Sequence, residues 1–329
     1  MNGASASTSR PPCPPAPDVY RQHWPLARAH AGVPEEEGRD VTVTLRAADR
    51  EAVTRLPDGR LLARAEWGPP GGPPVLLCPG AATSRLLGMD AQAVDAAGVL
   101  LVSFDRPGLG GSTHDPGRTL TSWAADVAHV VAQERWPRPV GIGFSQGGPF
   151  ALALAAAGTV SAVALVSAQD ELSARREDLD EHLLGLVDAV AADPSSVERS
   201  MATTVEPVSF VAMVREMNGG ADRLVYEERL FAEYFSAAVR EALRGGAEGY
   251  ARDLVLTLGA WPFRPEDITM PVHLWYGALD DSPVHSPDHG ARLAARIPNA
   301  RRTIVEGEGG AILWTRTAEI LADLGRMPR

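Results

Sequence analysis

The sequence predicts an α/β fold: a mostly parallel sheet of eight strands, helices on both of its faces, and one helical insertion. Short apolar runs alternate with helix-like segments along most of the chain, as in sheets whose parallel strands are connected by helices. The alternation stops between Asp170 and Ala260, where only helical patterns occur. Ser145 lies between two glycines where an apolar run meets an Ala/Leu-rich stretch, which predicts a reactive side chain at the carboxyl edge of the sheet.

The first elements form a hairpin. The β-branched run Val41–Leu45 predicts a strand, and Ala52–Leu56 and Leu61–Trp67 flank the turn sequence Pro57-Asp58-Gly59. The later strands are short and continuously apolar, as expected of strands buried on both faces. They are predicted at Val75–Cys78, Val99–Phe104, Val140–Phe144, Val160–Val166, Val272–Tyr276 and Arg302–Val305. Helices are predicted at Met89–Ala97, Ser122–Gln133, Phe150–Ala157 and His289–Ile297.

The pattern divides the chain into a core, a cap and an extension. Residues 41–170 and 261–329 are expected to form the α/β core, and residues 171–260 a helical cap over the carboxyl edge of the sheet. The cap carries the amphipathic patterns Leu179–Ala192 and Leu224–Leu243; a helical appendage packed elsewhere on the core is the alternative. Residues 1–40 form an N-terminal extension. Its start lacks the apolar segment of a secretion signal and is expected to be disordered.

Composition narrows the function classes. The net charge of −11 argues against nucleic acid or an anionic membrane surface as a partner, and no apolar stretch is long enough to span a membrane. Every basic side chain is arginine, which excludes Schiff-base lysine chemistry and pyridoxal phosphate anchoring. Cys13 lies in a polar tail and Cys78 in an apolar strand far along the chain, so a disulfide framework is not expected. We expect a cytoplasmic protein that acts on a small molecule without a metal or cofactor.

An ordered set of motifs carries a resemblance to a known family. Phe104–Ser112 reads as an Asp-Arg-Pro-Gly loop rich in glycine, and Ser145-Gln146-Gly147-Gly148-Pro149 follows an apolar strand. With Val75–Leu87 and Pro271–Asp280, these motifs resemble the α/β-hydrolase superfamily from about Leu56 to about Leu324, in particular a subgroup with a Ser-x-Gly-Gly-Pro elbow. The resemblance implies an α/β-hydrolase fold with a cap.

The resemblance also implies roles. Ser145 would be the nucleophile, and the main-chain amides of Gln146 and Ala81 would hold the oxyanion, each donor contributing about 3–4 kcal/mol. Asp280 follows a predicted strand at the spacing of the triad acid, and the adjacent Asp281 could replace it. A solvated turn carboxylate is the alternative interpretation of either aspartate.

The base is the open question. Relatives read Gly-x-Gly-His after the last strand, whereas this chain reads Gly307-Glu308-Gly309-Gly310, so Gly310 is predicted to leave the base position vacant. Without its histidine such a site loses about 10⁶ in rate. Three histidines near the same edge are candidates for a replacement base, although a histidine in such a place is more often a surface or structural residue: His285, His289 and His114.

The sequence is compatible with three functions. The first is a serine hydrolase acting on a small ester, thioester or lactone through Ser145 and a non-standard base. The second is a non-hydrolytic biosynthetic enzyme of the cyclase, decarboxylase or lyase type that uses the same pocket and oxyanion hole. The third is a non-catalytic binding protein that retains the cavity.

Overall fold

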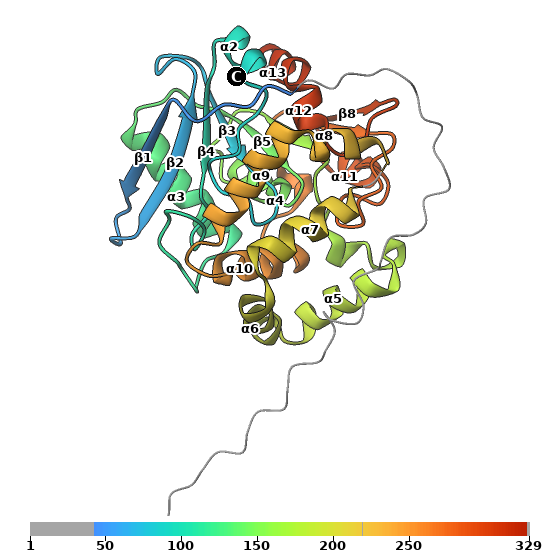
Figure 1. The fold of residues 1–329 in the computed structure, drawn as a ribbon. Helices are drawn as coiled ribbons and strands as arrows, with labels where there is room; N and C mark the ends of the chain where they lie inside the picture. Colours follow the sequence, from blue (N-terminus) through green and yellow to red (C-terminus); the bar gives the residue numbers. More distant parts are fainter. Residues whose placement is uncertain (1–42, 219, 328–329) are drawn as a thin grey trace, which may run out of the picture.

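A computed structural model describes residues 43–218 and 220–327, which contain one eight-stranded sheet of order β1-β2-β4-β3-β5-β6-β7-β8 (Figure 1). β1 pairs with β2, and β2 with β4, in antiparallel fashion, whereas all other neighbours are parallel. The predicted mostly parallel sheet is therefore confirmed. The strands are β1 (Arg50–Arg55), β2 (Leu61–Trp67), β3 (Pro74–Cys78), β4 (Leu100–Phe104), β5 (Val140–Phe144), β6 (Val163–Val166), β7 (Val272–Gly277) and β8 (Ala300–Val305).

The segment before β1 differs from the prediction. The expected strand Val41–Leu45 is not a strand over its described part, residues 43–45. Instead, the amide of Thr44 donates to Asp90 Oδ2 at 2.7 Å, and its carbonyl accepts from the amide of Ala91 at 2.7 Å. The backbone thus pairs with the start of a helix, and Val43 and Leu45 are buried in the core. The extension of residues 1–40, including Cys13, lies outside the described residues.

Two apolar layers cover the sheet. In β3, Val75 and Leu77 face one cluster, whereas Leu76 and Cys78 face the other, because successive side chains of a strand point to opposite faces. The first layer contains α2 (Ala91–Ala97), α12 (Ile312–Thr315) and α13 (Thr317–Arg326); the second contains α3 (Leu120–Gln133), α4 (Gly147–Ala156) and α11 (Ala291–Arg296). The helices therefore lie on both faces, as predicted.

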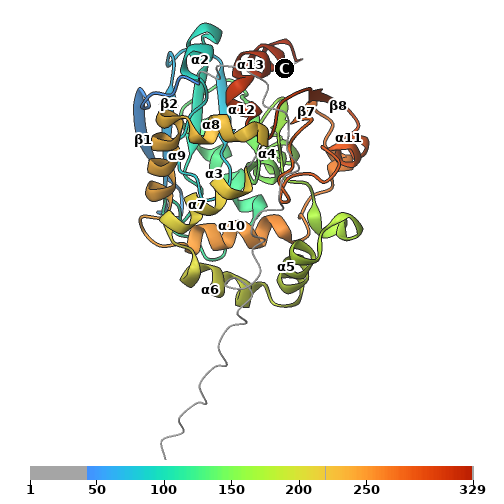
Figure 2. The ribbon, with the colours of Figure 1, turned by 45° about the vertical axis from the view of Figure 1, so that its right-hand side comes forward.

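The helical insertion lies between β6 and β7. Figures 1 and 2 show α5, α6, α7 and α10 gathered at one end of the molecule, below the sheet in both views. The predicted helix Leu224–Leu243 is interrupted at Glu228, whose carboxylate accepts from the amide of Phe231 and caps a new helix. The inserted helices are α5 (Glu181–Ala192), α6 (Pro194–Thr204), α7 (Pro207–Met217), α8 (Arg223–Glu227), α9 (Arg229–Ala242) and α10 (Glu248–Leu258).

A buried ion cluster ties the insertion to the core. Asp253 of α10 accepts from Arg106 Nε at 2.7 Å and from Arg118 Nη1 at 2.5 Å, and all three side chains are fully buried. Separating the buried carboxylate from the two guanidinium groups would leave unpaired buried charges, which costs free energy. This contact therefore fixes where α10 lies on the sheet. None of the helices in the described part of the chain combines the length and apolarity needed to cross a membrane.

Candidate active site

Ser145 lies on a strained turn between β5 and α4. Its φ angle is +51°, in the left-handed region that non-glycine residues rarely adopt. The flanking glycines make the turn possible: a β-carbon on Gly147 would lie 2.0 Å from the carbonyl oxygen of Cys78, and one on Gly143 would lie 2.8 Å from Ala151. The turn raises the hydroxyl above the carboxyl end of β5, as the sequence motif predicts.

The structure brings His285 and Asp280 to this hydroxyl. His285 Nε2 lies 2.9 Å from Ser145 Oγ, and His285 Nδ1 lies 2.9 Å from both carboxylate oxygens of Asp280. Nδ1–H donating to the carboxylate leaves Nε2 free to accept the hydroxyl proton. All three groups therefore form a connected Ser-His-Asp relay, although the histidine follows the aspartate by only five residues.

The electrostatics of the pair favour this arrangement. Burial acts to lower the pKa of His285, but the carboxylate of Asp280, assisted by Asp222 and Asp281, outweighs burial and raises it. Burial likewise acts to raise the pKa of Asp280, but His285 and the hydrogen bond from the Ser282 amide hold it below its usual range. Asp280 is thus held as an anion, and its charge favours protonation of the imidazole beside the serine.

The space beside Gly310 is filled, which corrects the expectation of a vacant base position. A β-carbon on Gly310 would lie 3.0 Å from Asp280 Oδ1 and 3.1 Å from His285 Cε1. The loop is held by Asp222 of the insertion, whose carboxylate accepts from the amides of Gly310 at 2.7 Å and Ala311 at 2.8 Å. Burial raises the pKa of Asp222 to about 6, despite these two amide donors.

The other candidate histidines lie elsewhere. His289 Nε2 lies 3.1 Å from the carbonyl oxygen of Asp280, which accepts its hydrogen bond, and its ring lies beside Tyr276. His114 is exposed on the glycine-rich loop, with Nδ1 close to Gly108. Of the three candidates, His285 alone has a hydrogen bond to Ser145 among the described residues.

The two residues predicted to supply the oxyanion donors both line the cavity beside Ser145. Ala81, Gln146 and Ser145 line the same cavity, and Arg106 fixes the loop that carries Ala81. Arg106 Nη1 donates to the carbonyl of Pro79 at 2.7 Å, and Nη2 donates to the carbonyl of Gly80 at 3.0 Å. In a trans peptide the C=O and N–H point in opposite directions, so the Ala81 amide points away from Arg106. Arg106 therefore orients the Ala81 amide by binding the carbonyl side of the same peptide group.

Arg85, which follows the loop that carries Ala81, is engaged by three carboxylates. It donates to Asp105 at 2.5 Å, to Glu241 at 2.8 Å and to Glu51 at 2.6 Å. Asp105 also accepts from the amide of Gly111 at 2.7 Å and so anchors the glycine-rich loop. Arg85 is thus part of the scaffold and does not line the cavity beside Ser145.

A cavity of about 540 Å³ opens over the serine, within the usual range of small-molecule sites. All six inserted helices contribute to its wall, which is mainly apolar. The contributing side chains include Leu183, Leu186, Met201, Phe210, Met213, Met217, Tyr226, Phe235, Leu254 and Leu258. Within the described residues, no group of three or more His, Cys, Asp or Glu is arranged to hold a metal ion.

Comparison with known proteins identifies the family. A sequence profile described as the alpha/beta hydrolase family matches residues 75–323. The chain belongs to this family. A search of curated proteins finds no match.

Solved structures share the fold of this alpha/beta hydrolase at low sequence identity. A hydrolase from Pseudomonas aeruginosa PA01 is 17% identical with a TM-score of 0.64, over 84% of this chain and 97% of that one. An esterase from Rhodococcus sp. ECU1013 is 21% identical with a TM-score of 0.56, over 84% and 96%. An enol-lactonase from Burkholderia xenovorans LB400 is 20% identical with a TM-score of 0.60, over 83% and 98%. At such identities the likeness establishes the fold alone.

Three residues of this alpha/beta hydrolase site escaped the sequence reasoning. Arg106 lies in the Asp-Arg-Pro-Gly motif, and its place in this motif is the signal that could have identified it as a functional residue. Asp222 lies at the end of a short 3-10 helix in the insertion, where no pattern distinguishes it from the surrounding acidic residues. Ser286 directly follows His285, but its contact with Asp170 joins residues more than a hundred positions apart in the sequence.

Proposed function

We propose that this chain is a serine hydrolase that cleaves a small ester, thioester or lactone. The observation that carries the proposal is the relay in which His285 bridges Ser145 Oγ and the Asp280 carboxylate, each contact being 2.9 Å. A hydroxyl in contact with an imidazole that is oriented by a buried carboxylate is the arrangement that activates a serine nucleophile.

The proposed reaction has two halves. Ser145 Oγ attacks the carbonyl carbon while its proton passes to His285 Nε2, and the amides of Ala81 and Gln146 stabilise the oxyanion. When the tetrahedral intermediate collapses, the leaving alcohol or thiol takes the proton from His285, and an acyl-serine remains. Water then gives a proton to His285 and attacks the acyl carbon, which releases the acid and restores the serine.

The cavity favours an uncharged, largely apolar acyl group. Its described lining contains the carboxylates Asp180, Glu206 and Glu216 but no arginine, so an anionic acyl group would meet like charges and no guanidinium there. The methionines of the lining adapt to irregular shapes because their thioether chains are flexible. We therefore infer a neutral small-molecule substrate with a medium-sized apolar acyl portion.

A fluorophosphonate probe tests the proposal. The unmodified protein should be labelled at Ser145 and should hydrolyse p-nitrophenyl butyrate, whereas Ser145→Ala should do neither. His114→Ala is the matched control, since it removes an exposed histidine with no contact to Ser145. Absence of both labelling and hydrolysis in the unmodified protein would refute the serine mechanism. It would leave a non-hydrolytic enzyme or a binding protein as the function.

A further inference from the structure

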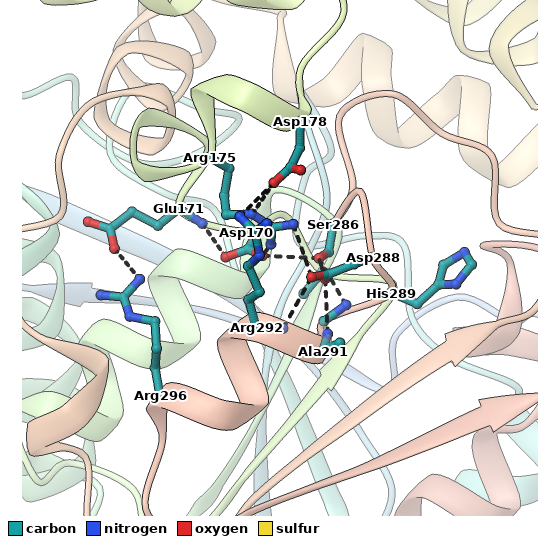
Figure 3. Close-up of polar contacts among 12 residues, drawn as sticks. Asp170, Glu171, Arg175, Asp178, Ser286, Asp288, His289, Ala291, Arg292 and Arg296 are labelled. Atoms are coloured by element: carbon teal, nitrogen blue, oxygen red, sulfur yellow. Dashed lines mark hydrogen bonds and ion pairs between the residues drawn. The ribbon is translucent and has the colours of Figure 1, made fainter.

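A polar network lies behind the loop that carries His285. This loop joins β7 to α11, and Figure 3 shows its residues Ser286 and Asp288 facing Asp170 and Arg175, which come from the segment after β6. These four residues do not line the cavity. The network therefore touches neither the space for substrate nor Ser145, but it includes Ser286, the residue directly after His285.

Ser286 connects the loop to the core. Its Oγ lies 3.0 Å from Asp170 Oδ2 and 3.0 Å from Asp288 Oδ1, and it accepts from the amide of Gly290 at 2.9 Å. Ser286 and Asp170 are both buried, so a lost hydrogen bond here would not be replaced by water. The loop is thereby closed on itself and fastened to the carboxyl end of β6.

Arg175 is the hub of the network. Its Nη1 donates to Asp170 Oδ2 at 2.5 Å, its Nη2 to Asp288 Oδ2 at 3.0 Å, and its Nε to Asp178 Oδ2 at 2.8 Å. Its side chain is almost completely buried. A guanidinium has a rigid, planar set of donors, so bonds to three carboxylates define the positions of those groups relative to one another.

We propose that Arg175 is a positioning residue that, through Asp170, Ser286 and Asp288, holds His285 in register with Ser145. The proposal rests on the proposed function, in which His285 is the base. A base carried by a loop lacks the register that a strand end provides, and a displacement of about 1 Å at a reacting group can cost about 10²-fold in rate. The network supplies the missing constraint. His289, on the same loop, has its ring turned away from the network in Figure 3.

The test compares kcat and KM for p-nitrophenyl butyrate among four variants. Arg175→Gln should lower kcat about 10- to 100-fold with little change in KM, because the substrate cavity is untouched. Arg175→Lys should fall between Gln and the unmodified protein, since one ammonium can still bridge two carboxylates. Ser286→Ala should lower kcat in the same direction by less. Arg296→Gln is the matched control: Arg296 binds the side chains of Glu171 and Glu266 in the same region, and among the described residues its guanidinium has no hydrogen bond to Asp170, Ser286 or Asp288.

A second measurement does not depend on turnover. The titration of the His285 imidazole by NMR should move to lower pH in Arg175→Gln, because a loosened loop weakens the contact with Asp280 that raises the pKa of His285. The other groups that act on this imidazole, Asp222 and Asp281, are unchanged by the substitution. A merely structural role for Arg175 would lower the melting temperature without moving this titration.

The outcomes separate the two proposals. An unmodified protein that neither labels nor hydrolyses refutes the proposed function, while the imidazole titration still tests the positioning role. Unchanged kcat and an unchanged titration in Arg175→Gln would overturn the inference, as would a loss of kcat that only follows loss of folded protein. If Arg175→Gln does not fold, the same measurements on Arg175→Lys and Ser286→Ala test the inference. Unaltered kcat and an unaltered His285 titration in both variants would overturn it.

Discussion

A β-carbon placed on Gly310 would lie 3.1 Å from Cε1 of His285, so the imidazole fills the space that a side chain at position 310 would need. The loop after β8 and the loop after β7 thus converge on one corner beside Asp280. In this chain the loop after β7 carries the imidazole of His285, and the loop after β8 has a glycine at position 310. Although no histidine follows β8, an imidazole therefore still lies 2.9 Å from the hydroxyl of Ser145.

The Gly310→His variant should lose activity, although the sequence alone predicts a vacant base position there. Two imidazoles would compete for the contact with Asp280, so we expect kcat to fall at least about tenfold. Measurement of kcat on p-nitrophenyl butyrate checks this. The double variant Gly310→His/His285→Ala should exceed His285→Ala alone, because a ring from position 310 then has room. A rate increase in the single variant would show that His285 is not the working base.

Removal of the imidazole should abolish most activity. We expect His285→Ala to lower kcat by about 10⁴–10⁶, as for the loss of a base from a comparable relay. Added imidazole should restore part of the rate, since truncation opens a ring-sized space between Ser145 and Asp280. His114→Ala and His289→Ala measured beside it locate the base: if either one costs as much as His285→Ala, the assignment fails.

The pH dependence follows from the raised pKa of His285. The imidazole accepts the serine proton only when it is neutral, so kcat/KM should increase with pH through this pKa, with a midpoint above the ordinary value of about 6.5. Asp280→Asn removes the charge that raises the pKa, so the midpoint should shift to lower pH while the plateau falls. A midpoint that stays in place in Asp280→Asn would contradict the pairing.

Asp222 should make the protein less stable as pH rises. Burial raises the pKa of Asp222 from the ordinary carboxyl value to about 6, so the folded state binds more protons than the unfolded state between about pH 4 and 6. Its contribution to the free energy of unfolding is therefore lost across that window, by about 3 kcal/mol at most. Urea unfolding at several pH values should show this decline, and Asp222→Asn should lack it. Equal slopes in both proteins would contradict the assignment.

Arg106 should affect the chemical step from behind the oxyanion loop. In Arg106→Lys, one ammonium cannot reach Asp253 and both loop carbonyls at once, so the Ala81 amide loses part of its support. We expect kcat to fall about tenfold with a smaller change in KM, because the donor acts mainly in the transition state. A change confined to KM would assign Arg106 to the shape of the cavity instead.

The sequence by itself determined the sheet, the elbow and the insertion. These follow from local patterns: continuous apolar runs for buried strands, two glycines around Ser145, and amphipathic spacing between residues 171 and 260. The β-branched residues before β1 predicted a strand that does not form, because the backbone of Thr44 pairs with the start of α2 instead of with another strand. The sequence also missed the break at Glu228, where a capping side chain divides one helical pattern into two.

Only the tertiary structure decided which histidine meets the serine. His285, His289 and His114 share a residue type and an edge of the sheet, and their spacing from Asp280 does not reveal where their rings point. That direction is set by contacts between distant segments: Ser286 with Asp170, Arg175 with Asp288, and Asp222 with the Gly310 amide. Patterns of local sequence encode secondary structure, whereas the direction of a side chain on a loop depends on which remote partners the folded chain brings to it.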